Sequence, residues 1–338
     1  MSASLIGLST TELCNRCASS AFPAFRGKQI ADWIYRKGVV DPLQMSNLPK
    51  PIKDWLASET IGCPEIVNRT DSKDGSTKLL LKLADEESIE SVLLPYKDRV
   101  SLCVSTQVGC PLGCVFCATG ASGFSRNLTI GEIVGQYIAA SSVSTSRISH
   151  VVMMGMGEPF LNLDNALGAI NILEEEIGIS ARHITISTIG IPDQIRRLAT
   201  KKLQFTLAIS LHAPNQTLRT TLMPAVKKYP LVELISACKY YSEITRRRLT
   251  FEYLLIDDIN DKPQHAHELC KLLQDIPCHV NLIPYNPVSS CDFLRSSRKN
   301  IDQFKAILES KRISVTQRFE RGTAADSACG QLKRSADS

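Results

Sequence analysis

The sequence has little that would place it in a membrane or outside a cell. It contains no run of roughly 18 consecutive apolar residues, the length a membrane-spanning helix needs, and no apolar leader segment. Internal repeats and low-complexity tracts are also absent, apart from a polar tail after Leu332. The net charge of +5 is small, so charge alone permits an anionic partner such as RNA without indicating one. We therefore expect a cytoplasmic protein with no membrane contact.

Cysteine, in contrast, is abundant. The chain has 12 cysteines in 338 residues. In a sequence of this length without a leader, such a number indicates metal or redox chemistry in a reducing compartment rather than structural disulfides. The length itself allows one large domain with a smaller appendage.

The first third of the sequence changes periodicity near residue 60. Before that point Ile30, Trp33 and Ile34 fall on one stripe of a helix, and a proline-containing break at residues 47–51 precedes another short helix. We therefore expect a small helical domain over residues 1–60. Apolar residues then alternate with period two on both sides of a polar turn, which predicts a linking β-hairpin within residues 61–95.

From residue 96 onward, strand-like runs alternate with amphipathic helical segments. Repeated β–α units predict a parallel sheet with helical crossovers. Six or so units are too few for a closed eight-stranded barrel, so the expected fold is α/β, a partial (β/α)6 barrel over residues 96–332, followed by a polar tail at 333–338. Reactive groups in such folds collect at the C-terminal ends of the strands. The expected strands are 102–105, 150–154, 183–187, 205–210, 250–256, 278–283 and 313–318.

The most informative motif is Cys110-Pro-Leu-Gly-Cys114-Val-Phe-Cys117. Short cysteine spacings on one loop allow a chain to wrap an iron–sulfur cluster. Three ligands without a fourth leave one iron open, as catalytic metal sites do. A zinc loop or three buried cysteines are the alternatives. Zinc, however, favours paired C-x2-C knuckles with four ligands, and core cysteines have no reason to cluster.

This motif, with Phe116 before its last cysteine, resembles the signature of the radical S-adenosylmethionine (SAM) superfamily. The resemblance implies one 4Fe-4S cluster on these cysteines, whose open iron binds the amino and carboxylate groups of SAM. Gly157 and Glu158, which follow the second barrel strand, resemble the family's Gly-Gly-Glu-Pro motif that contacts the SAM amino group. Further SAM candidates are ordinary turn residues when taken singly, and only their place at strand ends selects them. They are Ser187, Ser210, Leu211, His212 and Asn286.

Seven motifs occurring in order extend the resemblance to nearly the whole chain. Together with the helical start, they resemble the RlmN/Cfr family of RNA adenine methyltransferases. Compared with that family's pattern, the segment 289–298 is short and the segment 321–328 is diverged, which bears on substrate docking. The seven motifs are Glu90, Cys103–Cys110, Phe116–Gly120, Met153–Pro159, Ser187–Gly190, Ser210–Ala213 and Ala328–Leu332.

The resemblance implies a role for each of three further residues. Cys329, on a segment rich in small residues that we expect to be mobile, would take a methyl group from one SAM and lose a hydrogen atom to the radical made from a second. Glu90 would accept the proton that leaves the adenine ring. Cys103 would then release methylated RNA by forming a transient disulfide with Cys329.

The implied substrates are adenine C2 in 23S ribosomal RNA and in tRNA, with a reductant for the cluster as a further partner and a monomer as the expected state. Three alternatives stay open: methylation at C8, a radical SAM enzyme with a non-RNA substrate, and a non-catalytic RNA-binding relative. The presence of Cys329 and Glu90 argues against the last two.

Basic clusters at 196–197, 201–202, 227–228 and 246–248 fit either RNA phosphates or solvated helix faces. Cys14 and Cys17 form a C-x2-C pair that alone cannot complete a zinc site.

Overall fold

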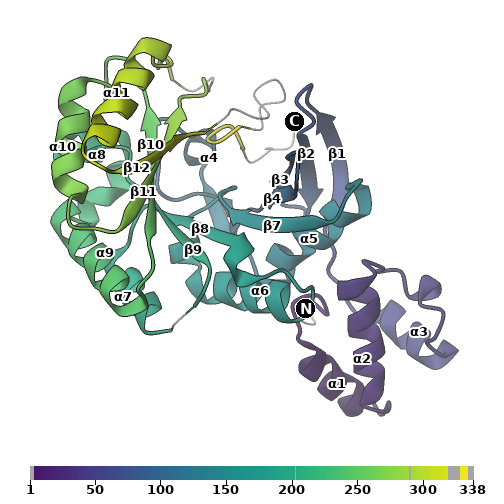
Figure 1. Cartoon of the computed structure of the whole chain (residues 1–338). Helices are drawn as coiled ribbons and strands as arrows, with labels where there is room; N and C mark the ends of the chain where they lie inside the picture. The colour runs from purple at the N-terminus through teal and green to yellow at the C-terminus, as the bar shows by residue number, and fades with distance from the viewer. Residues whose placement is uncertain (1–3, 202, 289–290, 319–327, 334–338) are drawn as a thin grey trace.

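The computed structural model describes residues 4–201, 203–288, 291–318 and 328–333. Within these ranges the chain forms one curved ten-stranded sheet with helices on its outer face and a separate group of N-terminal helices (Figure 1). No helix in these ranges is long and apolar enough to cross a membrane.

The N-terminal group consists of α1 (Thr10–Ser19), α2 (Phe25–Ala31) and α3 (Lys50–Ser58). Ser9 caps α1 in a reciprocal capping box with Glu12, which satisfies backbone donors at the start of the helix. Ile30 and Ile34 are fully buried, as their shared stripe predicts. Both cysteines of the C-x2-C pair lie on α1, and the described residues supply no further donors that would complete a metal site there.

The N-terminal helices are joined to the rest of the protein by close backbone contacts. Within this N-terminal part, the N–H of Leu5 donates to the carbonyl of Thr60 and that of Ile6 to the carbonyl of Ile61, each at 3.0 Å, so residues 5 and 6 are held beside the segment that leads into β1. A Cβ atom added to Gly131 in α5 (Ile130–Val143) would lie 2.3 Å from the carbonyl oxygen of Ile6. Only glycine therefore permits this approach.

The linking segment is larger than the expected hairpin. It contains β1 (Glu65–Asp71), β2 (Thr77–Lys82) and β3 (Ser88–Pro95), which pair antiparallel in order. Strand β3 also pairs antiparallel with β4 (Val100–Cys103), so the three strands extend the barrel sheet instead of standing apart from it. The sequence did not predict β1, because its side chains are mostly exposed and lack apolar alternation.

The parallel part of the sheet confirms the predicted α/β partial barrel. Six strands follow one another in space in the order of the chain, and the short β12 adds a seventh. Central residues such as Ile186, Leu207, Phe251 and Leu282 are fully buried, as expected for parallel strands covered by helices. The strands after β4 are β7 (Ile148–Met153), β8 (Ile184–Thr188), β9 (Thr206–Ser210), β10 (Leu249–Leu255), β11 (Cys278–Pro284) and β12 (Ser314–Gln317).

Helices connect successive strands on the outer face of the sheet (Figure 1). Besides α5, they are α6 (Leu163–Glu175), α7 (Pro192–Thr200), α8 (Gln216–Leu222), α9 (Leu231–Thr245), α10 (Pro263–Leu273) and α11 (Arg298–Ser310).

A two-stranded ribbon that the sequence did not predict brackets the cysteine loop. It pairs β5 (Gln107–Gly109) with β6 (Phe124–Asn127), and the loop between them carries the one-turn helix α4 (Ala118–Ala121). Gly109 has φ +74°, and a Cβ there would meet the carbonyl of Gly123, so the ribbon closes only with glycine at this position.

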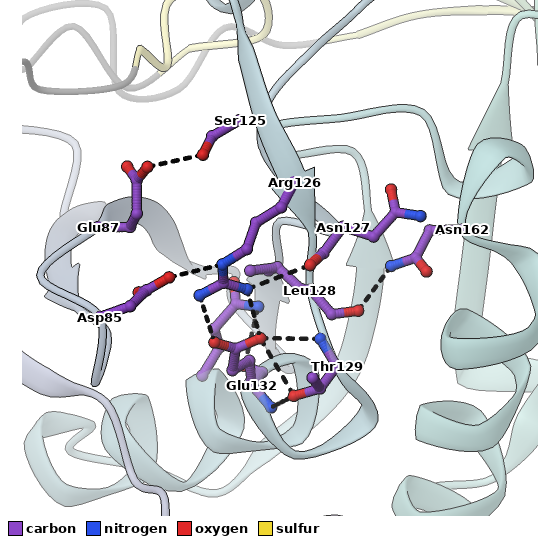
Figure 2. Close-up of polar contacts among 10 residues, drawn as sticks. Asp85, Glu87, Ser125, Arg126, Asn127, Leu128, Thr129, Glu132 and Asn162 are labelled. Carbon is purple, nitrogen blue, oxygen red and sulfur yellow. Dashed lines mark hydrogen bonds and ion pairs between the residues drawn. The ribbon is translucent and has the colours of Figure 1, made fainter. Parts of the chain in front are cut away.

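Arg126 ties this ribbon to two other elements (Figure 2). Its Nε donates to Asp85 at 2.7 Å, and its two terminal nitrogens donate to the carboxylate of Glu132 at 2.9 and 2.7 Å. Asp85 lies in the turn between β2 and β3, and Glu132 lies in the first turn of α5. A hydrogen bond from Ser125 to Glu87 reinforces the link to the turn. The flanks of the cysteine loop are therefore fixed to the strand pair that carries Glu90.

Candidate active site

A cavity of about 160 Å³, which we call the cluster-side cavity, opens at the C-terminal ends of the barrel strands. This is the end at which barrel enzymes of this kind place their chemistry. Its walls come from the cysteine loop after β5 and from the C-terminal ends of β7, β8, β9, β10, β11 and β12 with the residues that follow them. The expected site residues that line it are Cys110, Cys114, Cys117, Gly157, Glu158, Ser187, Ser210, His212 and Cys329.

The three loop cysteines are free and half-buried. Burial raises the pKa of the Cys110 thiol to about 12 and that of Cys114 well above its usual value. Because metals bind the thiolate, occupation of this loop releases protons. The loop is held by two backbone hydrogen bonds, from Cys110 to Gly123 at 2.9 Å and from Val115 to Leu222 at 3.1 Å.

The donor set fits a four-iron cluster better than a single ion. In the described ranges, no three His, Cys, Asp or Glu side chains form a group that would hold one metal ion. A four-iron cluster does not need that arrangement, since each thiolate binds a different iron atom of the cube. Three thiolates on one loop facing one cavity therefore fit such a cluster with an iron left open toward the cavity.

Glu158 ends the loop after β7 and is almost fully buried. Its carboxylate accepts hydrogen bonds from the N–H groups of Phe160 and Ile189, each at 2.8 Å. Burial raises its pKa to about 7, although these hydrogen bonds and one from Thr188 oppose the increase. The preceding Gly157 has φ +102°, and a Cβ there would lie 2.6 Å from Gln107, so the turn needs glycine.

Residues at the C-terminal ends of β8 and β9, and His212 two residues after β9, also line the cavity. The hydroxyls of Ser187 and Ser210 are 3.2 Å apart. The Nδ1 of His212 accepts from the N–H of Leu254 at 3.0 Å, and burial lowers the pKa of His212 to about 3, so its ring stays neutral. Leu211 is fully buried and does not line the cavity.

A second cavity of about 90 Å³, the β3-side cavity, lies next to the first. Cys103, Asn286 and Cys329 line it, and Cys329 lines both cavities. Cys103 pairs with Val92 of β3, burial raises its pKa to about 12, and the charge of Cys329 adds to that increase. The structure thus brings Cys103 and Cys329 to one cavity although they lie at opposite ends of the barrel sequence. Asn286 donates to the carbonyl of Cys329 at 3.4 Å.

Glu90 lies on β3, two residues before Val92, so the two side chains share a face of the strand. It is buried, and one carboxylate oxygen lies 3.1 Å from the Lys78 ammonium. The other oxygen accepts from the N–H of Lys333 at 2.8 Å. Glu90 does not itself line either cavity, whereas Val92 and Leu94 line the β3-side cavity.

The segment around Cys329 is more strongly held than its small residues suggested. Gly330 accepts from the N–H of Ala118 at 2.7 Å, and Leu332 accepts from the hydroxyl of Thr119 at 2.5 Å. Both partners lie on α4, directly after the cysteine loop. Residues 328–333 are therefore docked on that loop. Three sets of positions named from the sequence lie outside the described residues. They are 321–327 of the diverged segment, 289–290 of the short segment and 334–338 of the polar tail.

Arg318 is a site residue that the sequence analysis missed. Its Nη1 donates to the sulfur of Cys329 at 3.3 Å, and it lines both cavities. The pKa of Arg318 is raised, chiefly by the charge of Cys329 and also by that of Glu252 on β10. Its position directly after β12 was an available signal, because the other candidates were also selected at strand ends.

Comparisons with known proteins match the chain from end to end. Residues 3–61 match the family model described as ribosomal RNA large subunit methyltransferase N-terminal domain, and residues 104–270 match the radical SAM superfamily. A probable dual-specificity RNA methyltransferase RlmN from Thermosynechococcus vestitus is 48% identical, with 98% of each chain covered. The corresponding protein from Gloeobacter violaceus is 45% identical, with 99% of this chain and 96% of that one covered.

A solved structure gives the same result. The crystal structure of a radical SAM methyltransferase from Sphaerobacter thermophilus matches with a TM-score of 0.95 and 44% identity, covering 98% of this chain and 99% of that one. A 4Fe-4S cluster and SAM are accordingly the cofactors of this fold. On this similarity over almost its full length, the chain belongs to the RlmN family of radical SAM RNA methyltransferases.

Proposed function

We propose that this protein methylates C2 of an adenine in 23S ribosomal RNA and in tRNA, through a methylated cysteine and a transient protein–RNA crosslink. The position of Cys329 carries the proposal, because this thiol lines both cavities. All three cluster cysteines line the cluster-side cavity, and Cys103 and Val92 of the Glu90 strand line the β3-side cavity. The names of the relatives, dual-specificity RNA methyltransferases, support RNA as the substrate.

When bound, the cluster and SAM would supply the methyl group and the radical that removes a hydrogen atom from it, and the cluster would take back one electron once the carbon has bonded to the ring. In this proposal Cys329 carries the carbon throughout. Its thiolate takes the methyl group, and after hydrogen removal that carbon bonds to the adenine ring. Arg318, 3.3 Å from the sulfur, stabilises the thiolate that accepts the methyl group.

Two further residues complete the proposed sequence. Glu90 accepts the proton that leaves the ring carbon. The Cys103 thiolate then attacks the sulfur of Cys329, the sulfur–carbon bond breaks, and the released carbon keeps the electron pair and takes up a proton. The resulting disulfide is reopened by a cellular thiol reductant. Cys103 and Cys329 line the same cavity, which supports this step.

Separating the two cysteines by mutation tests the crosslink. We expect Cys103→Ala, purified from RNA-containing cells, to carry covalently bound RNA on denaturing gels, because the bridge forms and is not released. Cys329→Ala and the double variant should run free of RNA, since neither can form the bridge. Cys63→Ala, at a half-buried thiol outside both cavities, serves as the matched control. RNA-free Cys103→Ala protein would rule out the resolving role of Cys103.

The position of methylation needs a separate measurement. Nucleoside mass spectrometry of ribosomal and transfer RNA from cells lacking the gene should show loss of 2-methyladenosine, restored by the intact gene. Loss of 8-methyladenosine instead would replace C2 by C8 while leaving the roles of the cysteines unchanged.

A further inference from the structure

Arg219 is a fully buried arginine that the proposed chemistry does not use. It lies on α8, and one terminal nitrogen, Nη2, donates to the carbonyls of Ile189 and Ser210. Its Nε and Nη1 have no hydrogen-bond partner among the described residues. Buried polar groups are nearly always hydrogen-bonded, and a buried charge without a counter-charge is strongly unfavourable. The two unpaired nitrogens therefore point to an anionic group that the protein's own side chains do not supply.

The surroundings of Arg219 locate that group. The last residue of α8, Leu222, accepts a hydrogen bond from Val115 in the middle of the cysteine loop. Arg219 lies one helical turn earlier and interacts electrostatically with the buried Cys238 and, less strongly, with Cys114. Arg219 donates to the carbonyl of Ile189, and the N–H of the same residue donates to the Glu158 carboxylate. Arg219 therefore lies behind the cavity wall, next to the cluster ligands.

A purely structural role does not account for this arrangement. An arginine that only anchors backbone carbonyls would direct its donors to them, whereas Arg219 uses one nitrogen in this way. Within the described ranges no carboxylate forms an ion pair with Arg219. A four-iron cluster with three thiolate ligands is anionic, so it would supply the missing negative charge.

We propose that Arg219 is the counter-charge of the 4Fe-4S cluster. Charge and hydrogen bonds at the sulfurs of a cluster stabilise its reduced, more negative form. Arg219 thus raises the reduction potential of the cluster without contacting RNA. The inference rests on the cluster site of the proposed function and is independent of RNA methylation.

The test compares Arg219→Met and Arg219→Lys with wild type and with Arg196→Met, an arginine on the outer helix α7. Reconstituted proteins without SAM or RNA are titrated with reductant and followed by electron paramagnetic resonance. For Arg219→Met we expect about a tenfold lower ratio of reduced to oxidised cluster at a fixed potential, which corresponds to about 59 mV for a one-electron couple. Lys, which keeps the charge, should restore part of the difference, and Arg196→Met should match wild type.

Three results would overturn the proposal. An unchanged midpoint with only a lower melting temperature would make Arg219 a structural anchor. An unchanged midpoint with weakened SAM binding would assign its charge to the SAM carboxylate. If Arg219→Met holds no cluster, the free energy of unfolding in urea is compared between the cluster-free variant and cluster-free wild type. The proposal expects that variant to be at least as stable as cluster-free wild type, because it lacks an uncompensated buried charge, and lower stability would contradict it. None of these measurements depends on the crosslink experiments with Cys103 and Cys329, so the two proposals can fail separately.

Discussion

At the scale of single residues, burial controls which groups at the site carry charge. Glu158 and His212 both line the cluster-side cavity, and burial moves their pKa values in opposite directions, to about 7 and about 3. Both shifts favour the neutral side chain in the free protein. With a pKa of about 7, the Glu158 carboxyl is close to half ionised at neutral pH.

Glu158 makes the stability of the cluster-free protein depend on pH. Its folded-state pKa of about 7 is above the ordinary value of 4.5, so the folded state favours the protonated form. This contribution is complete below pH 4.5 and is lost as pH rises through 7, which amounts to about 3 kcal/mol. Urea unfolding between pH 4.5 and 8 should show this decline in wild type relative to Glu158→Gln. Parallel curves for the two proteins would contradict it.

Glu90→Gln should separate bond formation from proton removal. The amide keeps the shape of the side chain and an acceptor for the Lys333 N–H, but it is a poor base. We expect the variant to bind iron and SAM, to methylate Cys329 and to stall with RNA attached, as seen by protein mass spectrometry and denaturing gels. Glu86→Gln, in the turn between β2 and β3 and with 73% of its side chain exposed, is the matched control. Full methylation by Glu90→Gln would mean that another group removes the proton.

At the scale of elements, the β5–β6 ribbon and the β2–β3 turn act as one support for the site. The ribbon brackets the cysteine loop, the strand after the turn carries Glu90, and Arg126 joins the two (Figure 2). Charge-assisted, bidentate hydrogen bonds of this kind are stronger than exposed ion pairs. The ion pairs are only partly exposed, with 32% of the Arg126 side chain and 18% of Glu132 accessible.

Loss of this connection should have a measurable effect. Arg126→Met should lower the free energy of unfolding by about 1–3 kcal/mol, the usual effect of removing hydrogen bonds to charged groups. Arg298→Met is the control, because its pair with Asp302 is 3.8 Å long and its side chain is 94% exposed, so a change within about 0.5 kcal/mol is expected. Urea unfolding measures both. Equal losses of unfolding free energy in the two variants would mean that the Arg126 ion pairs do not stabilise the ribbon.

At the scale of the whole molecule, the N-terminal helices depend on contact with the barrel. Backbone of residues 5–7 passes directly over the start of α5, and Thr10 donates to Glu176 after α6 at 2.7 Å. This contact fixes the position of the N-terminal helices relative to the end of the sheet where α5 packs (Figure 1).

Gly131→Ala should loosen that contact. The added methyl group would lie 2.3 Å from the carbonyl oxygen of Ile6, and backbone cannot move aside as a side chain can. Amide hydrogen exchange in residues 4–58 should therefore become several-fold faster, with little change in the barrel strands. Gly168→Ala in α6 is the control, since the nearest neighbours of its methyl group would be side-chain atoms of Ile130 and not backbone, and alanine favours the helix by about 1 kcal/mol. Unchanged exchange in Gly131→Ala would show that the two parts tolerate separation.

Much of the catalytic end of the barrel is determined by the sequence itself. The spacing of Cys110, Cys114 and Cys117 places three thiols on one loop, because a few intervening residues cannot separate them. Alternation of β and α periodicity determines a parallel sheet, whose strand ends share one edge. Gly157, Glu158, Ser187 and Ser210 could therefore be assigned to one site by position alone.

Other features depend on the tertiary structure. The approach of Cys329 to Cys103 follows from the order and curvature of ten strands, which no local spacing encodes. Strand β1 and the β5–β6 ribbon form through pairing with neighbours and not through apolar alternation. Arginines are usually exposed, so nothing in the local sequence marks Arg219 as buried or Arg318 as a partner of Cys329. Burial and proximity across the barrel belong to the packed chain as a whole, and only the folded structure determines them.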